Sequence, residues 1–430
     1  MNISQYFVRM ISFIGLLVFF SQTVLAATIE LPLENCISLA LKNNPSIKAA
    51  VEDKERYSWG INEAIGNKNP SLVFTHTDDR KRAAISNASS SGELYNLFTN
   101  QFTFSLPLYS GGKYENAIDE AKLNYKVSEL TLASVKQQIK FNVTANYCQV
   151  LQYRNLVKAD QESVDDYALH LRNLQASYET GSASKLQVLQ TKVSLANAQQ
   201  TLIKDQNNYH VALINLNNVI GLPRDTEVVP KEDLKYEKNS MSIEECVNYA
   251  MENHPEMIIY KNNIAIAEDN VKIAKSGYLP TVSLDGYDAW QSTHLPGTKY
   301  NYFSVYLVTS FNIFDSGVTR SKVKEASAAL HKAQETAKQE SDTVYANVNQ
   351  YYLSMREAEK RIETCSVSVE EAEEALMITM ARFQAGLGTN QDVLDQEVAL
   401  STAKNNYIQA LYDYNTDKAG LEAAMGVVVN

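Results

Sequence analysis

The chain has 430 residues, 45% of them hydrophobic, and its 39 basic and 50 acidic side chains give a formal net charge of −11. This length is sufficient for a sizeable core, and the acidic balance lacks the basic surplus that a nucleic-acid-binding surface needs. We therefore expect no nucleic acid among its partners.

The first 26 residues have the pattern of a secretory signal peptide. Arg9 precedes an apolar run over residues 10–20, and Val24-Leu25-Ala26 suits cleavage after residue 26. The run is short for a membrane-spanning helix, and no later stretch reaches about 18 unbroken apolar residues. We therefore expect an exported chain that would meet a membrane only through strands.

A tandem duplication organises the rest of the chain. LPLENCISLALKNNPSIKAA, from Leu31, aligns without a gap on MSIEECVNYAMENHPEMIIY, from Met241. Further on, LPLYSGGKYENAIDEAK, from Leu106, aligns on FNIFDSGVTRSKVKEAS, from Phe311, and this second offset holds to the end. We assign residues 27–225 to the first repeat, 226–240 to a charged linker and 241–430 to the second repeat.

Each repeat begins with a helix that a proline interrupts. These helices are expected over about 33–66 and 243–277, with breaks near Pro45 and Pro255. Cys36 and Cys246 occupy equivalent positions, and we expect both to be buried as small apolar residues. Four cysteines in an exported chain permit disulfides, but a chain of this length does not need them.

Two strand-like segments follow in each repeat, and we expect them to form hairpins over about 71–106 and 281–313. Their alternation over roughly 9 to 11 residues suits tilted strands that cross a bilayer. Apolar side chains alternate with polar ones at Phe98, Phe102, Phe104, Leu106, Phe303, Val305, Leu307, Phe311 and Ile313.

Four strands cannot close a barrel, and an open sheet edge is not viable in hydrocarbon. Two, three or four chains could share one barrel, with four strands from each chain. The number of strands per chain does not decide how many chains take part. Aromatic residues near the strand ends suit interfacial girdles, or alternatively cover a sheet outside any membrane. They are Tyr95, Phe98, Trp290, Tyr300, Tyr302 and Tyr306.

A helical segment of unusual length comes next in each repeat. Residues 113–180 and 318–385 contain no glycine or proline. As single helices they would each be about 100 Å long, several times the average globular helix. Gly181 and Gly386 then interrupt, and a shorter helical pattern returns. Each repeat is therefore expected to end in an antiparallel helical hairpin with its tip near residue 181 or 386.

This order of elements resembles the TolC-like outer membrane efflux proteins of Gram-negative bacteria. The similarity extends from about Thr28 to Val429. Its most specific parts are GLGTNQDVLDQEVALSTAKNNY, TGSASKLQVLQTKVSLANAQ, LPLYSGG and FNIFDSG. The resemblance implies a mainly α fold with a membrane β-barrel portion: a trimer whose twelve-stranded barrel, four strands per chain, continues into a periplasmic α-helical barrel.

The resemblance also implies a function and partners. The chain would be the outer membrane exit duct of a tripartite efflux or type I secretion system, passively conducting substrates to the outside. Its partners would be two further copies, a periplasmic adaptor (membrane fusion protein), an inner-membrane transporter and outer membrane lipid.

The second tip carries two acidic residues after its glycines. Thr389 and Asp392 have the spacing of a capping box, as do Ser184 and Gln187 at the first tip. Capping does not account for Asp395, one helical turn further on the same face. By resemblance, Asp392 and Asp395 ring the periplasmic aperture, where six carboxylates in a trimer would favour cations. The alternative is an ordinary solvated acidic helix start.

Small residues at the tips have two interpretations as well. Their glycines permit tight turns. By resemblance, the tips also receive the helical hairpins of the adaptor. The contact residues would be Gly181, Ser182, Ala183, Gly386, Leu387 and Gly388. Phe383 and Gly388 stand where relatives have aperture-latching residues, so closure through the same links is not implied.

No motif indicates an enzyme. The six histidines are scattered without metal-binding spacing, and we expect them at the surface. Ser110-Gly111-Gly112-Lys113 lacks the spacing of a phosphate-binding loop, and there is no GxSxG. We therefore expect no catalytic residue, metal or cofactor. A periplasmic coiled-coil adaptor or structural protein, and an enzyme on a helical scaffold, rank below the duct.

Overall fold

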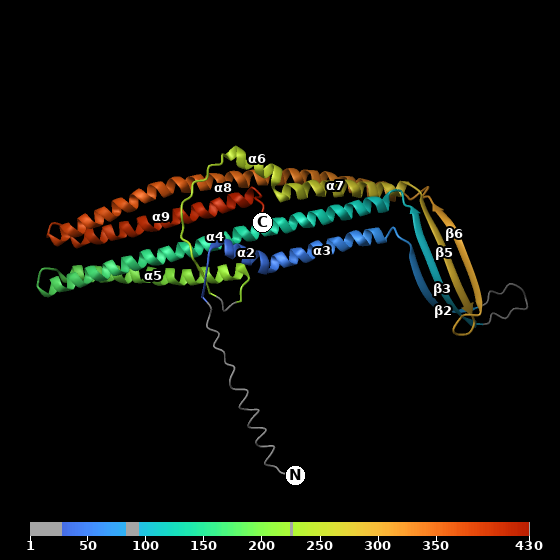
Figure 1. Cartoon of the computed structure of the whole chain (residues 1–430), viewed down its shortest axis with the longest axis horizontal. Coiled ribbons are helices and arrows are strands. Elements are labelled where there is room, and N and C mark those ends of the chain that lie inside the picture. Colours follow the sequence, from blue (N-terminus) through green and yellow to red (C-terminus); the bar gives the residue numbers. More distant parts are fainter. Residues whose placement is uncertain (1–27, 83–93, 224–226, 430) are drawn as a thin grey trace, which may run out of the picture. The chain divides into compact units, whose positions relative to one another are not determined.

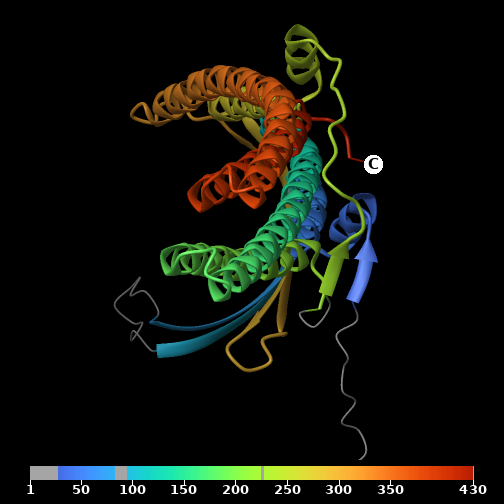
Figure 2. The same ribbon diagram turned by 90° about the vertical axis from the view of Figure 1, so that its left-hand side faces the viewer.

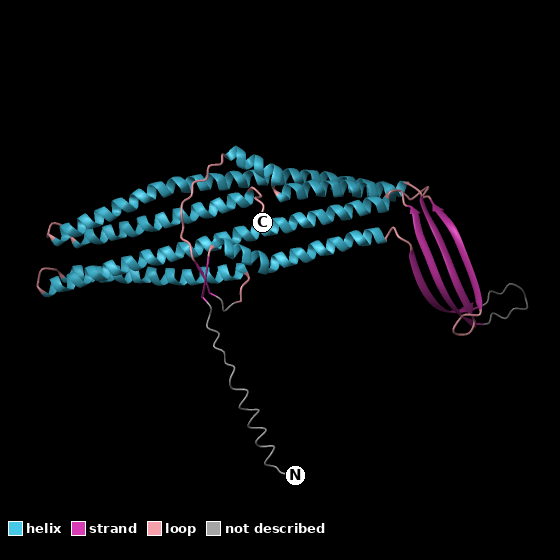
Figure 3. Ribbon diagram, viewed as in Figure 1, coloured by secondary structure: helices cyan, strands magenta, loops and turns pink. Residues whose placement is uncertain are grey.

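The computed structural model describes residues 28–82, 94–223 and 227–429. The expected signal peptide, residues 1–26, lies outside these ranges, as does most of the loop in the first strand hairpin. The chain is mostly helical, as the sequence predicted (Figures 1 and 3).

The elements follow one another in a fixed order. The first half contains β1 (Thr28–Leu31), α2 (Leu33–Asn43), α3 (Pro45–Gly66), β2 (Ser71–Arg82), β3 (Leu94–Tyr109), α4 (Lys113–Glu179) and α5 (Lys185–Ile220). The second half contains β4 (Glu227–Pro230), α6 (Ile243–Asn253), α7 (Pro255–Lys275), the short 3₁₀ helix η1 (Ser276–Tyr278), β5 (Thr281–Ser292), β6 (Tyr300–Ser310), α8 (Val318–Gln384) and α9 (Asn390–Ala424).

Proline breaks the early helices where the sequence predicted. Asn44 and His254 have extended backbone between α2 and α3 and between α6 and α7. A residue before proline is pushed out of the helical region by the proline ring, which explains both breaks. Cys36 and Cys246 are 0% exposed, so their predicted burial is confirmed. None of the four cysteines, all of which lie in the described residues, forms a disulfide.

The strands β2, β3, β5 and β6 form one antiparallel sheet in that order (Figure 3). Both predicted hairpins are therefore present. One expected boundary is wrong, because β6 ends at Ser310 rather than at residue 313. Ser310 pairs with Thr281, the first residue of β5, and Pro280 before it has no N–H to donate to a further pair. Phe311 and Ile313 therefore lie beyond the strand.

The strand register sorts the side chains onto two faces, because paired residues in an antiparallel sheet point to the same side. Phe74 pairs with Phe102, and Leu106 pairs with Leu284, which pairs with Leu307. We call this side the apolar sheet face. It carries Leu72, Phe74, Phe98, Phe102, Phe104, Leu106, Val282, Leu284, Trp290, Phe303, Val305 and Leu307.

Aromatic contacts cross the apolar sheet face. The ring centroids of Phe74 and Phe102 are 5.0 Å apart, and those of Phe102 and Trp290 are 6.2 Å apart. Polar side chains lie on this face as well, among them Asp288, whose Oδ1 accepts a hydrogen bond from Asn301 Nδ2 at 2.8 Å. Others are His76, Asp78, Arg80, Asn96, Asn100 and Asn301. The opposite face is mainly polar. It carries Thr75, Thr77, Thr99, Gln101, Thr103, Ser105, Asp285 and Ser304, with Tyr287, Tyr302 and Tyr306.

The two long helices, α4 and α8, have 67 residues each and are uninterrupted, as predicted. Each ends in a turn that needs a left-handed glycine, with φ of 78° at Gly181 and 74° at Gly386. Ser182 N and Leu387 N then donate to carbonyls five residues earlier, which closes the helix ends. Within the described residues, no helix combines the length and apolar character needed to cross a membrane.

A short parallel strand pair was not predicted. β1 pairs with β4 from Thr28 opposite Glu227 to Leu31 opposite Pro230 (Figure 2). The predicted linker thus begins as a strand. Arg154 of α4 holds it there, since Nη1 donates to Pro230 O at 2.9 Å and Nη2 donates to Glu232 O at 2.7 Å.

The chain divides into two compact units. One comprises residues up to 45, 139–239 and 351–420, and contains both helical tips. Its core includes the fully buried side chains of Val143, Tyr147, Leu216, Met355 and Tyr414. The other comprises residues 46–138, 240–350 and 421–430, and contains the four-stranded sheet. The helices α4 and α8 contribute residues to both units.

Candidate functional site at the helical tips

Both returning helices start with reciprocal hydrogen bonds. Thr389 N donates to Asp392 Oδ2 at 2.8 Å, and Asp392 N donates to Thr389 Oγ1 at 3.2 Å. At the other tip, Ser184 N donates to Gln187 Oε1 at 2.8 Å, and Gln187 N donates to Ser184 Oγ at 3.3 Å. Each pair satisfies two N–H groups that a helix start leaves free, and so fixes where α5 and α9 begin.

The acidic pair lies on the exposed side of the first turns of α9. Asp392 and Asp395 are both exposed. The backbone N–H of Thr389 is the main cause that lowers the pKa of Asp392, so this side chain is ionised at neutral pH. Asp395 Oδ1 accepts a hydrogen bond from Gln391 Nε2 at 2.7 Å. The capping role therefore engages Asp392 and leaves Asp395 on the solvent side of α9.

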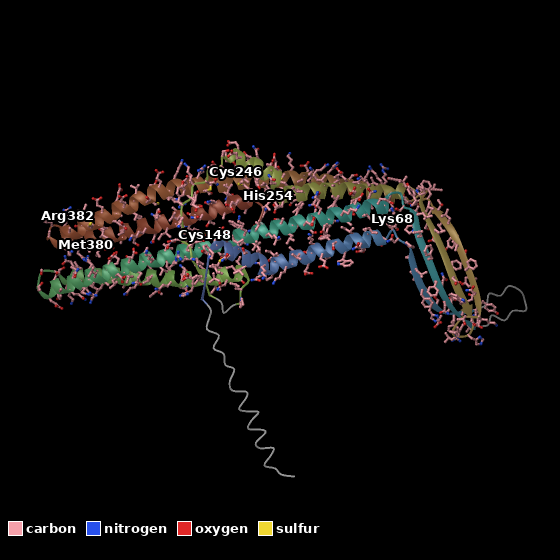
Figure 4. All side chains as sticks on the ribbon, viewed as in Figure 1. Lys68, Cys148, Cys246, His254, Met380 and Arg382 are labelled. Atoms are coloured by element: carbon pink, nitrogen blue, oxygen red, sulfur yellow. The ribbon has the colours of Figure 1, made fainter. Side chains whose placement is uncertain are left out.

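Small and exposed residues form both turns. Gly181, Ser182, Gly386 and Leu387 are exposed, whereas Ala183 and Gly388 are half-buried. The Leu387 side chain is 71% exposed. Figure 4 labels Arg382 and Met380 near this end of α8, and Arg382 Nη2 donates to Leu387 O at 3.4 Å.

A buried polar group behind the second tip was missed by the sequence interpretation. His170, expected at the surface, is only 3% exposed. Its Nε2 lies 2.8 Å from Oδ1 of Asn390, which is also buried, and Asn390 Nδ2 donates to Thr191 Oγ1 at 3.4 Å. The Phe383 ring meets the imidazole edge-on with centroids 5.4 Å apart. Burial lowers the pKa of His170.

The sequence does contain a signal for this buried histidine. Val164, Tyr167, His170 and Leu174 recur at helical spacing, and all four are buried in α4.

A second histidine, His254, was also expected at the surface and is buried. It lies at the start of α7, where its Nδ1 accepts a hydrogen bond from Glu256 N at 3.3 Å and so caps the helix. Within the described residues, no three His, Cys, Asp or Glu side chains gather as a metal would require.

Comparison with known proteins decides the family. The family model described as "Outer membrane efflux protein" matches residues 36–222 and 246–427. The chain belongs to this family. The resemblance found in the sequence is thereby confirmed, and members of the family are channels rather than enzymes.

Two relatives and one solved structure illustrate the similarity. The chain is 21% identical over 406 residues to the alkaline protease secretion protein AprF of Pseudomonas aeruginosa, covering 91% of this chain and 83% of AprF. It is 22% identical over 343 residues to the pyoverdine export outer membrane protein OpmQ of the same species, covering 79% and 72%. A crystal structure of a membrane protein from Pseudomonas aeruginosa superposes with a TM-score of 0.83 at 16% identity, covering 93% of this chain and 91% of that one.

This outer membrane efflux protein is therefore an exit channel for efflux or type I secretion. It lies in the outer membrane and extends into the periplasm. Homologues of this chain are components of tripartite efflux or secretion systems, which implies a periplasmic adaptor and an inner-membrane pump as partners.

Proposed function

We propose that three copies of this chain close a twelve-stranded barrel in outer membrane lipid, continuous with a periplasmic barrel of helical hairpins. The trimer passively conducts substrates that the inner-membrane pump delivers through the adaptor. The two aligned repeats, residues 27–225 and 241–430, each contribute one strand hairpin and one helical hairpin. The signal peptide, residues 1–26, directs export and is removed.

The apolar sheet face is the observation that carries this proposal. On the edge strand β6, Phe303, Val305 and Leu307 are 77%, 67% and 61% exposed. Such a row of apolar side chains is costly in water and suited to lipid. The opposite, polar face then lines the conduit.

The two edges of the sheet support closure between copies. β2 and β6 are the outer strands, with 12 and 11 residues. An unpaired edge cannot remain exposed to hydrocarbon, because its N–H and C=O groups would have no partners there. The similar lengths allow β6 of one copy to pair along most of β2 of the next. Three copies with four strands each give the twelve-stranded barrel.

The tips supply an electrostatic filter and a docking surface. Six exposed carboxylates, from Asp392 and Asp395 of three copies, surround the periplasmic aperture and favour cations. Salt weakens this preference because it screens exposed charges. The exposed turns dock the adaptor hairpins through Gly181, Ser182, Ala183, Gly386, Leu387 and Gly388. The rest of each tip is held by the caps at Ser184, Gln187 and Thr389.

The names of the relatives support a general conduit. AprF is named for alkaline protease secretion and OpmQ for pyoverdine export, two cargoes of very different size. We propose that the pump selects the cargo and that this chain supplies the route.

Native mass spectrometry of the detergent-extracted protein tests the assembly. A complex with three times the mass of the mature chain, recovered from the outer membrane fraction, supports the proposal. A dimer or a tetramer contradicts the twelve-stranded barrel. A monomer in the soluble periplasmic fraction instead favours a coiled-coil adaptor or structural protein.

A further inference from the structure

A line of polar contacts joins α4 to α9 along the unit that contains the tips. Gln152 Nε2 donates to Gln409 Oε1 at 2.6 Å. Nearer the tip, Lys404 Nζ donates to Glu162 Oε2 at 3.0 Å. Nearest the tip lies the buried bond between His170 and Asn390. The partners run in opposite directions along the two helices, so they mark one antiparallel contact, which we call the α4–α9 seam.

Glu397 lies inside this seam without a full set of partners. It is 3% exposed, and its Oε1 makes no hydrogen bond within the described part of the chain. Asp166 of α4 lies on the partner helix and repels its negative charge. The cation whose charge acts on Glu397, Lys404, is shared with two other carboxylates, Glu162 at 3.0 Å and Glu373 at 3.6 Å. An ionised Glu397 is therefore buried, under-bonded and poorly compensated.

Burial is the main cause that raises the pKa of Glu397 to about 7, and the charge of Asp166 raises it further. Burial also raises the pKa of Asp166. Lys404 lowers the pKa of both carboxyls. Tyr167, whose pKa burial raises to about 12, stays neutral and adds no charge.

The sign of the pH effect follows from these shifts. An acid whose pKa is raised in the packed state binds its proton more tightly there. The packing is therefore most favourable below the ordinary pKa of glutamate, 4.5, and weakens as the pH rises towards about 7. His170 acts in the opposite direction, because burial lowers its pKa and acid would place a charge beside Asn390.

We propose that the α4–α9 seam is a proton-dependent lock on the tip of the duct. With Glu397 protonated, α9 packs against α4. When Glu397 is ionised, its burial and the repulsion from Asp166 loosen the two helices. Glu397 comes less than two turns of α9 after Asp392 and less than one turn after Asp395, so loosening here moves the aperture carboxylates. This consequence for passage rests on the proposed function, whereas the change in packing does not.

Hydrogen exchange on the full-length protein in detergent tests the packing directly. Protection factors for residues 390–404, corrected for the intrinsic exchange rate, are compared at about pH 5 and about pH 8. We expect protection in the wild type to fall by at least about tenfold, the effect of one pKa unit, as the pH rises. Glu397→Gln should keep its protection at both pH values, and Asp166→Asn should reduce the fall. The matched control is Glu374→Gln, an exposed acid on α8, which should behave as the wild type.

Two results would overturn the lock: protection in the wild type that does not change with pH, or an equal fall in Glu397→Gln. Ion conductance in planar bilayers, measured at the same pH values, separates this failure from that of the proposed function. Current that rises with pH in the wild type and not in Glu397→Gln supports both. If current is observed but protection does not depend on pH, the lock is rejected and the proposed conduit stands. If no current is observed but protection changes with pH as expected, the proposed conduit is rejected and the lock stands.

Discussion

The ring of Tyr351 on α8 lies against the backbone of Gly420 on α9, and leaves no space for a β-carbon at position 420. A glycine inside a helix normally weakens it relative to alanine. Here the missing side chain lets a tyrosine approach, so the two helices of this hairpin pack closely. Tyr351 also meets Phe141 of α4 edge-on, with ring centroids 6.3 Å apart, which fixes the tyrosine ring in place.

Gly420→Ala should therefore destabilise the protein despite the better helix propensity of alanine. The added methyl group displaces the ring of Tyr351, at a cost of about 1–3 kcal/mol. The matched control is Gly60→Ala in α3, where a β-carbon would meet nothing within 4 Å. Thermal unfolding followed by the helical circular dichroism signal should give a lower midpoint for Gly420→Ala and an equal or higher midpoint for Gly60→Ala. Equal midpoints for wild type and Gly420→Ala would remove the packing argument.

The two faces of the sheet should respond differently to the same charge. Val305 and Ser304 are neighbours on β6 and point to opposite faces. Val305→Lys places an ammonium on the apolar sheet face, at a cost of about 2–4 kcal/mol near the middle of a bilayer. Ser304→Lys places it on the polar face. We expect Val305→Lys to deplete the protein from the outer membrane fraction in immunoblots, while Ser304→Lys accumulates normally. Equal accumulation would mean that this face does not meet lipid.

Asp417 on α9 should make stability depend on pH. Burial raises its pKa to about 6, and Asp413 and Glu357 add to the effect. The folded state therefore holds this proton more tightly than the unfolded chain does. The free-energy cost of burying the ionised Asp417 carboxylate is absent below about pH 4 and reaches its full size above about pH 6. Asp417→Asn should stabilise the protein at alkaline pH by about 1–2 kcal/mol after solvent screening, and have little effect in acid.

The neighbouring Asp413 supplies the matched comparison for this prediction. Its Oδ2 accepts from Arg361 Nη2 at 2.8 Å, so Asp413→Asn removes an ion pair. Midpoints of thermal unfolding are measured at several pH values. Above about pH 6, the midpoint of Asp417→Asn should be higher than that of the wild type, and the midpoint of Asp413→Asn should be lower. A lower midpoint for Asp417→Asn at alkaline pH would show that its charge stabilises the fold.

The four cysteines, none of which forms a disulfide, should differ in reactivity towards a maleimide. Burial raises the pKa of Cys36 to about 11 and that of Cys148 to about 12, so neither forms the reactive thiolate at neutral pH. Cys246 is fully buried, whereas Cys365 is partly exposed. Mass spectrometry of the folded protein should find the label on Cys365 first, and Cys365→Ser should remove the fast phase. Rapid labelling of Cys36 or Cys148 would contradict their burial.

Local signals explain what the sequence could predict. Pro45 and Pro255 break helices through their own ring geometry, and absence of glycine and proline allows helices as long as α4 and α8. Capping pairs such as Thr389 with Asp392 are three residues apart, so they can be identified without a fold. Alternation within each hairpin also needs only neighbouring residues, which is why the apolar residues of β3 and those of β6 up to Leu307 were assigned correctly, whereas Phe311 and Ile313 lie beyond β6.

Contacts between distant residues explain what the sequence could not predict. β1 and β4 have four residues each, too few for an alternation pattern, and pair across about half of the chain. His170 and Glu397 are typical surface residue types, and they are buried only because α4 meets α9. The apolar sheet face likewise depends on the register between β3 and β5, which no local pattern sets.

Single-channel conductance of the purified protein in planar lipid bilayers tests the central claim most directly. Wild type is compared with the double variant Asp392→Asn/Asp395→Asn, in which the amide oxygen at 392 still caps α9. We predict a steady, cation-selective current for the wild type, and a current with reduced cation preference for the variant. Absence of current from both proteins, with the chain recovered as a soluble periplasmic monomer, would contradict the duct.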